Sequence, residues 1–350
     1  MKDSAERYLP EYIDDEETLN EVMTRPSPAL LDWVENISDP LLVLGAGGKM
    51  GPSLAVSAKR AAQESGVPLR VMAVSRYSDA NVQRWLEEKG VETISFDLLN
   101  HKEYDSLPDA QDVLYMVGLK FGTAQNPAMT WVMNTLIPSY VAERYARSRI
   151  VALSTGNVYP LVPVASGGSR ESDRMDPVGE YGNACMARER LFDHYSQQNN
   201  TPMALIRLNY AVDLRYGVLV DIAQKVYAEE PIDVTNGHLN CIWQGDANDM
   251  IIRSLALVDA PARPLNLTYP QVFSVRSLAR ETGALIEKQP VLIGEEADSA
   301  YLNNPELICE RLGIPLTPIP TVLRWTARWI ENNGRLLNKP THFEVRDGKY

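Results

Sequence analysis

The chain has 350 residues, with 34 Lys and Arg against 46 Asp and Glu, so its net charge is −12 when the histidines are neutral. Hydrophobic residues make up 45% and charged residues 23%, an ordinary globular composition that excludes a disordered chain and a small disulfide scaffold. A negative charge of this size repels phosphate backbones, and no dense basic cluster overcomes it locally. We therefore expect no nucleic acid partner.

The cysteines and histidines carry no metal or disulfide pattern. Cys185, Cys241 and Cys309 are far apart, odd in number and without CxxC spacing, and the four histidines are scattered, so we expect neither a disulfide framework nor a metal site. The amino terminus is acidic where a signal peptide would be basic, and no apolar run is long enough for a membrane span. The sequence thus predicts a cytoplasmic protein without a membrane partner.

The predicted elements alternate along the chain. An acidic extension at 1–37 has two expected short helices, at 15–23 and, after Ser27 as N-cap, at 28–37. Helical patterns follow at 50–65, 80–90 and 129–148. Between them lie apolar runs that predict strands, at 40–45, 69–75, 91–97, 112–118, 149–155 and 203–209.

These strands are nearly continuous in apolar residues rather than alternating, which is typical of a parallel sheet covered on both faces. Strand and helix in steady succession predict an α/β fold with a doubly wound parallel sheet, the Rossmann architecture. After about residue 213 the pieces become shorter, which indicates a smaller region over the carboxyl ends of the strands. Ligands of such sheets bind there.

The first expected strand runs directly into the segment GAGGKMG, in which Gly45, Gly48 and Gly51 have GxxGxxG spacing. The first glycine permits a tight turn, the second lets a pyrophosphate approach the backbone, and the third allows close helix packing. The helix that follows points its amino terminus at the anion. Because strand, glycines, helix and second strand occur in this order, the motif predicts a dinucleotide site.

The end of the second strand selects between NAD and NADP. An acidic residue there would grip the ribose 2′-hydroxyl and repel a 2′-phosphate, but this chain has Ser75 and Arg76. A hydroxyl and a guanidinium suit a 2′-phosphate, so the sequence predicts an NAD(P) cofactor and favours NADP. The alternative is that Arg76 lies on a solvated loop and Asp79 serves the ribose of NAD.

Further motifs follow the glycines in order: Asp97-Leu98 after the third expected strand, STGNVYP after the fifth and EYGNACMARE on the next helix. Over residues 38–335 the chain thereby resembles the extended short-chain dehydrogenase/reductase family, whose members include NAD-dependent epimerases and dehydratases. The segment 117–122 and Asn134 resemble the nicotinamide side of UDP-galactose 4-epimerase-like members. The resemblance implies an NAD(P)-binding core at 38–212 and a mainly substrate-binding region at 213–335. The helical extension at 1–37 and a tail at 336–350 lie outside it.

The resemblance also implies roles for individual residues. Thr155 and Tyr181 would be catalytic, the threonine hydrogen-bonding the reacting oxygen and the tyrosine moving its proton. Asp97 would hold the adenine, and Lys120 would approach the pyrophosphate and ribose. Substrate contacts would be Asn157, Arg207 and Asn209, although Asn209 follows Arg207 by two residues rather than the usual three. The implied cofactor-binding residues are Gly45, Gly48, Lys49, Met50, Gly51, Ser75, Arg76, Asp97, Leu98, Val117, Gly118, Lys120 and Asn134.

The implied chemistry is hydride transfer from a hydroxyl of a sugar or sugar derivative, through a keto intermediate. Whether the chain is an epimerase, a dehydratase or a reductase stays open, and so does a nucleotide on the substrate, since a simple sugar or sugar acid fits equally well. Family members commonly dimerise through the helices that correspond to 127–147 and 180–198, so a homodimer is expected by analogy.

The chain departs from the family's YxxxK pattern, because Cys185 stands where the lysine is expected after Tyr181. A tyrosine has a pKa of about 10, and a nearby ammonium lowers it. Three alternatives follow. Lys120 or Arg188 supplies the charge, or Cys185 takes part in a changed mechanism or a thiol switch, or the protein is a non-catalytic or weakly catalytic NAD(P)-binding sensor or scaffold.

Overall fold

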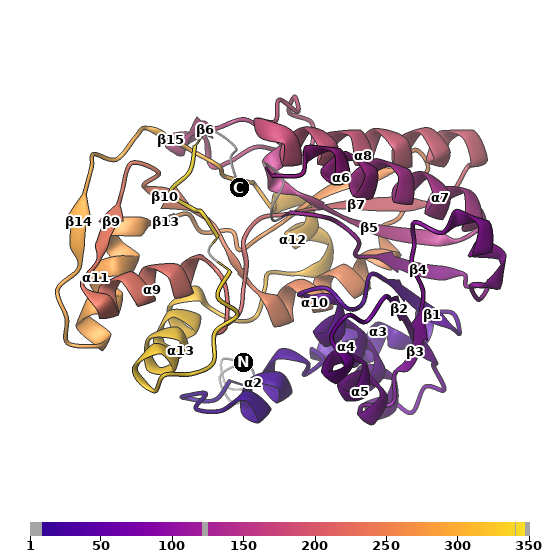
Figure 1. Cartoon of the computed structure of the whole chain (residues 1–350), viewed down its shortest axis with the longest axis horizontal. Coiled ribbons are helices and arrows are strands. Elements are labelled where there is room, and N and C mark those ends of the chain that lie inside the picture. The colour runs from indigo at the N-terminus through magenta and orange to yellow at the C-terminus, as the bar shows by residue number, and fades with distance from the viewer. Residues whose placement is uncertain (1–8, 121–124, 340, 347–350) are drawn as a thin grey trace.

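The computed structural model describes residues 9–120, 125–339 and 341–346. Its centre is a seven-stranded parallel sheet in the order β12-β7-β5-β4-β1-β2-β3, with helices on both faces (Figure 1). The predicted doubly wound α/β fold is confirmed. The strands of this sheet are β1 (Leu41–Leu44), β2 (Val71–Ser75), β3 (Glu92–Ser95), β4 (Asp112–Tyr115), β5 (Arg149–Thr155), β7 (Met203–Leu208) and β12 (Arg263–Leu267).

All six strands expected from the sequence are present in this sheet, and the seventh, β12, is an addition to them. It carries Pro264 in its interior, a residue that argues against a central strand because it lacks a backbone N–H. Within the described residues, the strand lies at the edge of the sheet and pairs with β7 alone, so no further strand on its other side needs the hydrogen bond that Pro264 cannot donate. Part of the segment 213–335 thus completes the main sheet.

Alternate residues of β1 enter different cores. Leu41 and Val43 pack under α3 (Pro28–Trp33), α4 (Gly51–Glu64) and α10 (Gln244–Arg253), whereas Leu42 and Leu44 pack under α7 (Ile137–Arg144) and α8 (Gly179–Asn199). A strand with both faces covered must be apolar at every position, which is what the sequence has here. The face with α4 also holds α5 (Ala80–Glu88), between β2 and β3.

The helix expected at 129–148 is interrupted. It consists of α6 (Pro127–Trp131), the π-helical turn η3 (Val132–Leu136) and α7. Pro138 cannot donate a hydrogen bond to the carbonyl four residues earlier, which accounts for the wider turn just before it.

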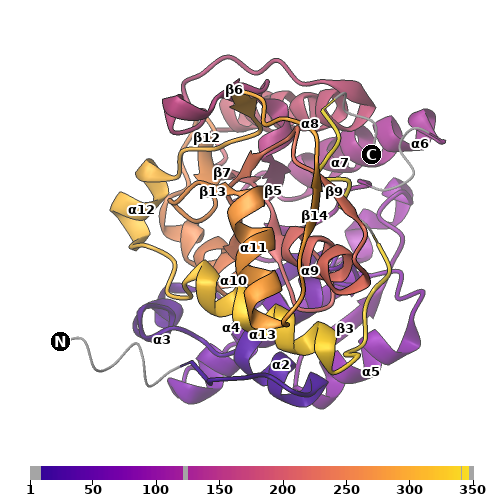
Figure 2. The same cartoon turned by 90° about the vertical axis from the view of Figure 1, so that its left-hand side faces the viewer.

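A second, smaller unit packs beside the sheet. It is built by α9 (Val218–Ala228), α11 (Val275–Leu285) and α13 (Ile319–Glu331), which lie together in Figure 2. Its core includes Leu19 and Met23 from α2 (Glu16–Met23), so the amino-terminal extension joins the two units. Short two-stranded ribbons complete it: β6 (Val162–Pro163) with β15 (Ser299–Ala300), β8 (Ala211–Val212) with β11 (Ile242–Trp243), β9 (Pro231–Asp233) with β14 (Val291–Ile293), and β10 (His238–Leu239) with β13 (Phe273–Ser274).

The carboxyl-terminal tail, of which residues 336–339 and 341–346 are described, runs back over this smaller unit (yellow in Figure 1). The Leu337 N–H donates to the Arg215 carbonyl at 2.9 Å, and the Thr341 N–H donates to Asp221 at 2.8 Å. Glu344 forms an ion pair with Lys225 of α9 at 2.6 Å. The described part of the tail is therefore held to the fold at Leu337, Thr341 and Glu344. The last predicted tail residues, 347–350, and residues 1–8 of the extension lie outside the described residues.

A buried ion pair fastens α8 to the sheet. Arg207 of β7 and Glu189 of α8 are separated by 2.8 Å between Nη2 and Oε2, and their side chains are 5% and 3% exposed. The Ser154 hydroxyl donates to the same carboxylate, and the Tyr159 hydroxyl accepts from Arg207. This network lies directly beneath the carboxyl ends of β5 and β7.

Replacing Arg207 with methionine leaves the Glu189 carboxylate buried without its partner, so Arg207→Met should lower the free energy of unfolding by about 3–5 kcal/mol. Urea denaturation measures this. The matched control is Arg70→Met, which removes an exposed pair with Asp39 and should cost about 1 kcal/mol or less. Equal losses in the two variants would contradict the structural role assigned to Arg207.

Candidate functional site

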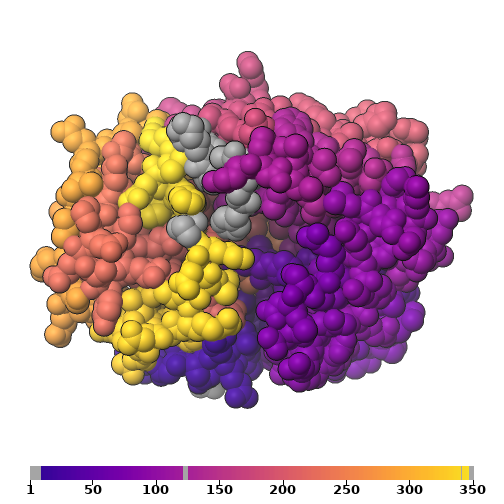
Figure 3. Space-filling model, in the orientation of Figure 1, coloured from indigo at the N-terminus to yellow at the C-terminus, as the bar shows by residue number. Residues whose placement is uncertain are grey.

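A cleft opens at the carboxyl ends of β1 and β4, where the strand order reverses. The chain continues from β1 to β2 and β3 on one side and to β4, β5 and β7 on the other, so the following loops diverge and leave a crevice. In Figure 3 this hollow lies between the purple half of the molecule and the yellow tail segment. Two cavities meet there and share Gly45, Gly48 and residues 116–118.

The glycine loop between β1 and α4 forms the floor of both cavities. Gly45 has a φ of +84°, and a Cβ there would lie 2.8 Å from the Val117 side chain. A Cβ on Gly51 would lie 2.6 Å from the Ala46 Cα, which is why the helix can start so close to the strand. Gly48 differs, because a Cβ there would meet the Gly45 carbonyl oxygen at 3.4 Å and otherwise face the cleft. An anion can approach the backbone at that point, beside the amino terminus of α4.

The first cavity, called the β2-side cavity here, has a volume of about 200 Å³. It brings together the predicted residues Ser75 and Arg76 after β2 with Asp97 and Leu98 after β3. Asp79 lines the same wall, so the structure places both candidate ribose partners at one cavity. Tyr77 is nearby with a left-handed φ of +45°, held by a hydrogen bond from its hydroxyl to the Ala73 carbonyl.

The second cavity, called the β5-side cavity, has a volume of about 480 Å³. The structure brings to its wall most of the residues predicted around the glycine loop, β4, β5 and α8. The last two residues of the segment 117–122 lie outside the described residues. The predicted residues on this wall are Gly45, Gly48, Lys49, Met50, Gly51, Val117, Gly118, Lys120, Thr155 and Tyr181.

Tyr181 and Thr155 meet at this cavity from different elements. Thr155 ends β5 and Tyr181 lies in the first turn of α8, and their side chains are hydrogen-bonded. The Tyr181 hydroxyl also has a hydrogen bond with the Cys185 thiol. Burial raises the pKa of Tyr181 above its ordinary value, Cys185 adds to this shift, and the positive charge of Arg188 opposes it.

Arg188 is a buried cation at the wall of the β5-side cavity. Its Nη1 donates to the Leu153 carbonyl at 2.7 Å and its Nη2 donates to Asn134, while Nε has no hydrogen-bond partner within the described part of the chain. A Cβ at position 118 would lie 2.7 Å from Nη2, so Gly118 allows the loop after β4 to cover the guanidinium. Cys185, one turn earlier, is fully buried, and burial raises its thiol pKa.

Four predicted residues are not among those that line the two cavities. Asn134 is buried behind the loop after β4, and Asn157 is hydrogen-bonded to Thr155. Arg207 takes part in the buried pair with Glu189, and the Asn209 amide donates to Asn240 at 2.7 Å.

Tyr210 lines the β5-side cavity and has a φ of +43°. It follows Arg207 by three residues, the spacing that the family pattern expects, so this signal was present in the sequence. Tyr216 and, from the tail, Lys339 and Thr341 also line the cavity, and no motif pointed to them.

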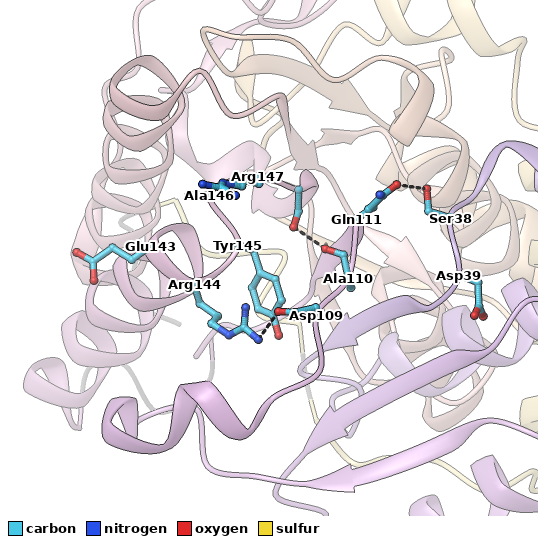
Figure 4. A pocket seen from close by; sticks show the side chains of 11 residues that line it. Ser38, Asp39, Asp109, Ala110, Gln111, Glu143, Arg144, Tyr145, Ala146 and Arg147 are labelled. Carbon is cyan, nitrogen blue, oxygen red and sulfur yellow. Dashed lines mark hydrogen bonds and ion pairs between the residues drawn. The ribbon is translucent and has the colours of Figure 1, made fainter.

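A larger groove of about 810 Å³ lies at the opposite end of the sheet, between the segments before β1, β4 and β5 (Figure 4). Several of its polar side chains are paired with one another. Arg144 forms an ion pair with Asp109 at 2.8 Å, and the Ser38 hydroxyl donates to Gln111. We therefore place the candidate site in the cleft at the carboxyl ends of the strands.

Within the described residues, no helix has the length and apolar character needed to cross a membrane. The same part of the chain contains no group of three or more His, Cys, Asp and Glu side chains arranged to hold a metal ion.

Solved structures share this fold. UDP-glucose 4-epimerase from Thermotoga maritima superposes with a TM-score of 0.67 and 16% identity, over 84% of this chain and 99% of that one. dTDP-glucose 4,6-dehydratase from Bacillus anthracis superposes with a TM-score of 0.71 and 13% identity, over 85% of this chain and 97% of that one. UDP-glucuronic acid 4-epimerase from Bacillus cereus superposes with a TM-score of 0.69 and 14% identity, over 84% of this chain and 99% of that one. At these identities the likeness concerns the fold.

No curated protein sequence matches the chain significantly. The family comparison is specific, however: residues 41–212, which contain the glycine loop, β1 to β5, Thr155 and Tyr181, match the NAD dependent epimerase/dehydratase family. Over these residues the chain belongs to the NAD-dependent epimerase/dehydratase family.

Proposed function

We propose that the protein is an NAD(P)-dependent oxidoreductase or epimerase-type enzyme that acts on a hydroxyl of a sugar or sugar derivative through a keto intermediate. The observation that carries this proposal is the hydrogen-bonded pair of Tyr181 and Thr155 at the wall of a cavity that continues to the glycine loop. A hydroxyl-bearing substrate can reach both side chains and a nucleotide at the same time only in such a shared cavity.

The residues present fit a dinucleotide. Gly48 leaves an open backbone at the amino terminus of α4 for a pyrophosphate, and the β2-side cavity offers Asp97 and Leu98 to an adenine. When bound, the nicotinamide supplies the hydride chemistry. The solved epimerase from Bacillus cereus was crystallised with NAD and UDP-glucuronic acid, which supports NAD and a sugar as the ligand classes.

Within NAD(P), Ser75 and Arg76 support NADP. Both line the β2-side cavity, and a guanidinium there can neutralise a 2′-phosphate. Asp79 in the same wall supports NAD instead, through a hydrogen bond to the ribose 2′-hydroxyl.

The proposed work of the protein residues is proton transfer. Tyr181 takes the proton of the reacting hydroxyl during oxidation and returns one to the ketone during reduction, and Thr155 hydrogen-bonds the same oxygen. Because the pKa of Tyr181 is raised, the side chain is protonated at neutral pH and is ready to donate to a ketone. Oxidation needs the phenolate, so its rate depends on how far Arg188 lowers that pKa. We propose that Arg188 supplies the positive charge near Tyr181 that the lysine of the YxxxK pattern would otherwise supply.

A weakly catalytic or non-catalytic NAD(P)-binding sensor is the second candidate. The observation that favours it is the raised pKa of Tyr181 beside an uncharged Cys185, since burial outweighs the effect of Arg188. The homodimer and the cytoplasmic location stay predictions. Exposed Met129 and Trp131 on α6 and Leu136 on η3 support a homodimer through that face.

Removing the Tyr181 hydroxyl should abolish proton transfer without disturbing the cofactor site. We expect Tyr181→Phe to lower NAD(P)H formation from an active sugar by about 10²- to 10⁴-fold, with nucleotide affinity within a few-fold of the native value. The control is Tyr140→Phe, whose ring stacks on His101 away from both cavities. Native turnover in Tyr181→Phe would remove this tyrosine from the mechanism.

The raised pKa of Tyr181 predicts the pH dependence of oxidation. Below that pKa the phenolate fraction grows about tenfold per pH unit, so the native oxidation rate should rise steadily from pH 7 to 9. Cys185→Lys places an ammonium beside the hydroxyl, lowers the pKa and should raise the rate at pH 7 by about tenfold or more. Cys185→Met fills the same space without charge and should keep the native profile.

A plateau below pH 8 in the native enzyme would contradict this account. An unchanged rate in folded Cys185→Lys would do so as well.

A further inference from the structure

The β5-side cavity has a basic wall. Of the described residues that line it, Lys49, Lys120, Arg188 and Lys339 are basic and none is acidic. The chain as a whole carries a net charge of −12, so this wall differs in sign from the protein around it. Such a cavity concentrates anions.

Lys49 reaches across the cavity rather than along the glycine loop. Its Nζ donates to the Ala211 carbonyl at 3.0 Å and lies 3.5 Å from the centre of the Tyr216 ring. Burial lowers the pKa of Lys49 to about 7. Asp213 and Asp221 oppose this shift. The Asp213 carboxylate forms an ion pair with Arg215 at 2.9 Å, and the Asp221 carboxylate accepts a hydrogen bond from the Thr341 N–H.

Lys120 approaches the same place from the loop after β4. Its Nζ lies 6.0 Å from the centre of the Tyr210 ring, and Tyr210 directly precedes Ala211. The two ammonium groups are close enough for Lys120 to depress the pKa of Lys49. Two like charges in a half-buried cavity repel each other. An anion bound between them would attract both ammonium groups and offset that repulsion.

The backbone at this point is strained. Tyr210 has a left-handed φ of +43°, a conformation that a bulky side chain rarely adopts and that tends to occur at ligand sites. Its ring lies on the cavity wall beside the residue that binds Lys49.

The tail limits the size of the ligand. Lys339 and Thr341 line the cavity together with the glycine loop, and the Thr341 N–H donates to Asp221 at 2.8 Å. The cavity of about 480 Å³ would also have to hold the nicotinamide half of a cofactor. Because a substrate would share this volume with the nicotinamide half, a small molecule fits the cavity better than a nucleotide sugar.

We propose that the substrate is a small acidic sugar derivative whose carboxylate or phosphate binds between Lys49 and Lys120 while its reacting hydroxyl lies at Thr155 and Tyr181. This inference rests on the proposed function. The amino terminus of α4 would serve the cofactor pyrophosphate, whereas the Lys49 ammonium lies at the Ala211 wall.

The test titrates the full-length protein, saturated with NAD or NADP, by calorimetry. The probes are D-gluconate, D-glucuronate, glucose 6-phosphate, neutral D-glucose and UDP-glucose. At least one acid should bind about tenfold or more tightly than glucose and more tightly than UDP-glucose. The carboxylate and phosphate probes distinguish the two forms of the anion.

Variants locate the subsite. Lys49→Met and Lys120→Met should each weaken binding of that acid by about tenfold or more, whereas Lys49→Arg, which keeps the charge, should stay within a few-fold. Lys102→Met removes an exposed lysine outside both cavities and should change nothing. The family resemblance assigns Lys49 and Lys120 to the cofactor, whereas the proposed subsite assigns them to the substrate anion. In both methionine variants the affinity for the nucleotide alone should therefore fall by a much smaller factor than the affinity for the acid.

Three results would overturn the proposal. The first is that glucose or UDP-glucose binds as tightly as every acid. The second is that Lys49→Met and Lys120→Met bind the acid with native affinity. The third is that these two variants lose affinity for the nucleotide by the same factor as for the acid, which would assign both lysines to the pyrophosphate. Failure of the proposed function looks different. In that case the acid still binds through Lys49 and Lys120, but no NAD(P)H forms with any sugar.

Discussion

The arrangement of the site depends on one steric constraint, the absence of side chains on the loop between β1 and α4. Gly45 lets Val117 from the neighbouring strand end close over the loop, and Gly51 lets the helix start against Ala46. With any larger residue at these two positions, the loops after β1 and β4 would separate and the two cavities would lose their common floor. Gly48 is different in kind, since its missing Cβ opens space toward the cleft and not toward the protein.

The positive charges around this floor show that a YxxxC chain can keep a cation near Tyr181 without the family's lysine. Arg188 is buried on the same helix as Tyr181, and hydrogen bonds to the Leu153 carbonyl and Asn134 fix the position of its guanidinium charge. An arginine in this position acts on the tyrosine electrostatically. Burial still outweighs this effect, so the pKa of Tyr181 stays above its ordinary value and the side chain is protonated at neutral pH.

The sequence predicted those parts of the structure that are encoded locally. The apolar run of β1 and the spacing of Gly45, Gly48 and Gly51 each follow from neighbours along the chain, and both are found where expected. The position of a side chain across the cleft depends instead on packing between distant segments. Arg207 turns toward Glu189 in the interior, and Lys49 extends to Ala211 on a wall formed 162 residues later. For the same reason, no local pattern indicated that Thr341 of the tail would line the cavity.

The most direct test of the central claim, that this cleft is a nucleotide site, is calorimetric titration of the nucleotide-free protein and of Gly48→Ala with NAD and NADP. The native protein should bind one of them in a one-to-one complex, and Gly48→Ala should bind it at least about tenfold more weakly with an unchanged melting temperature, because the new Cβ faces the cleft. No binding of either nucleotide to the native protein, or equal binding by folded Gly48→Ala, would contradict the account.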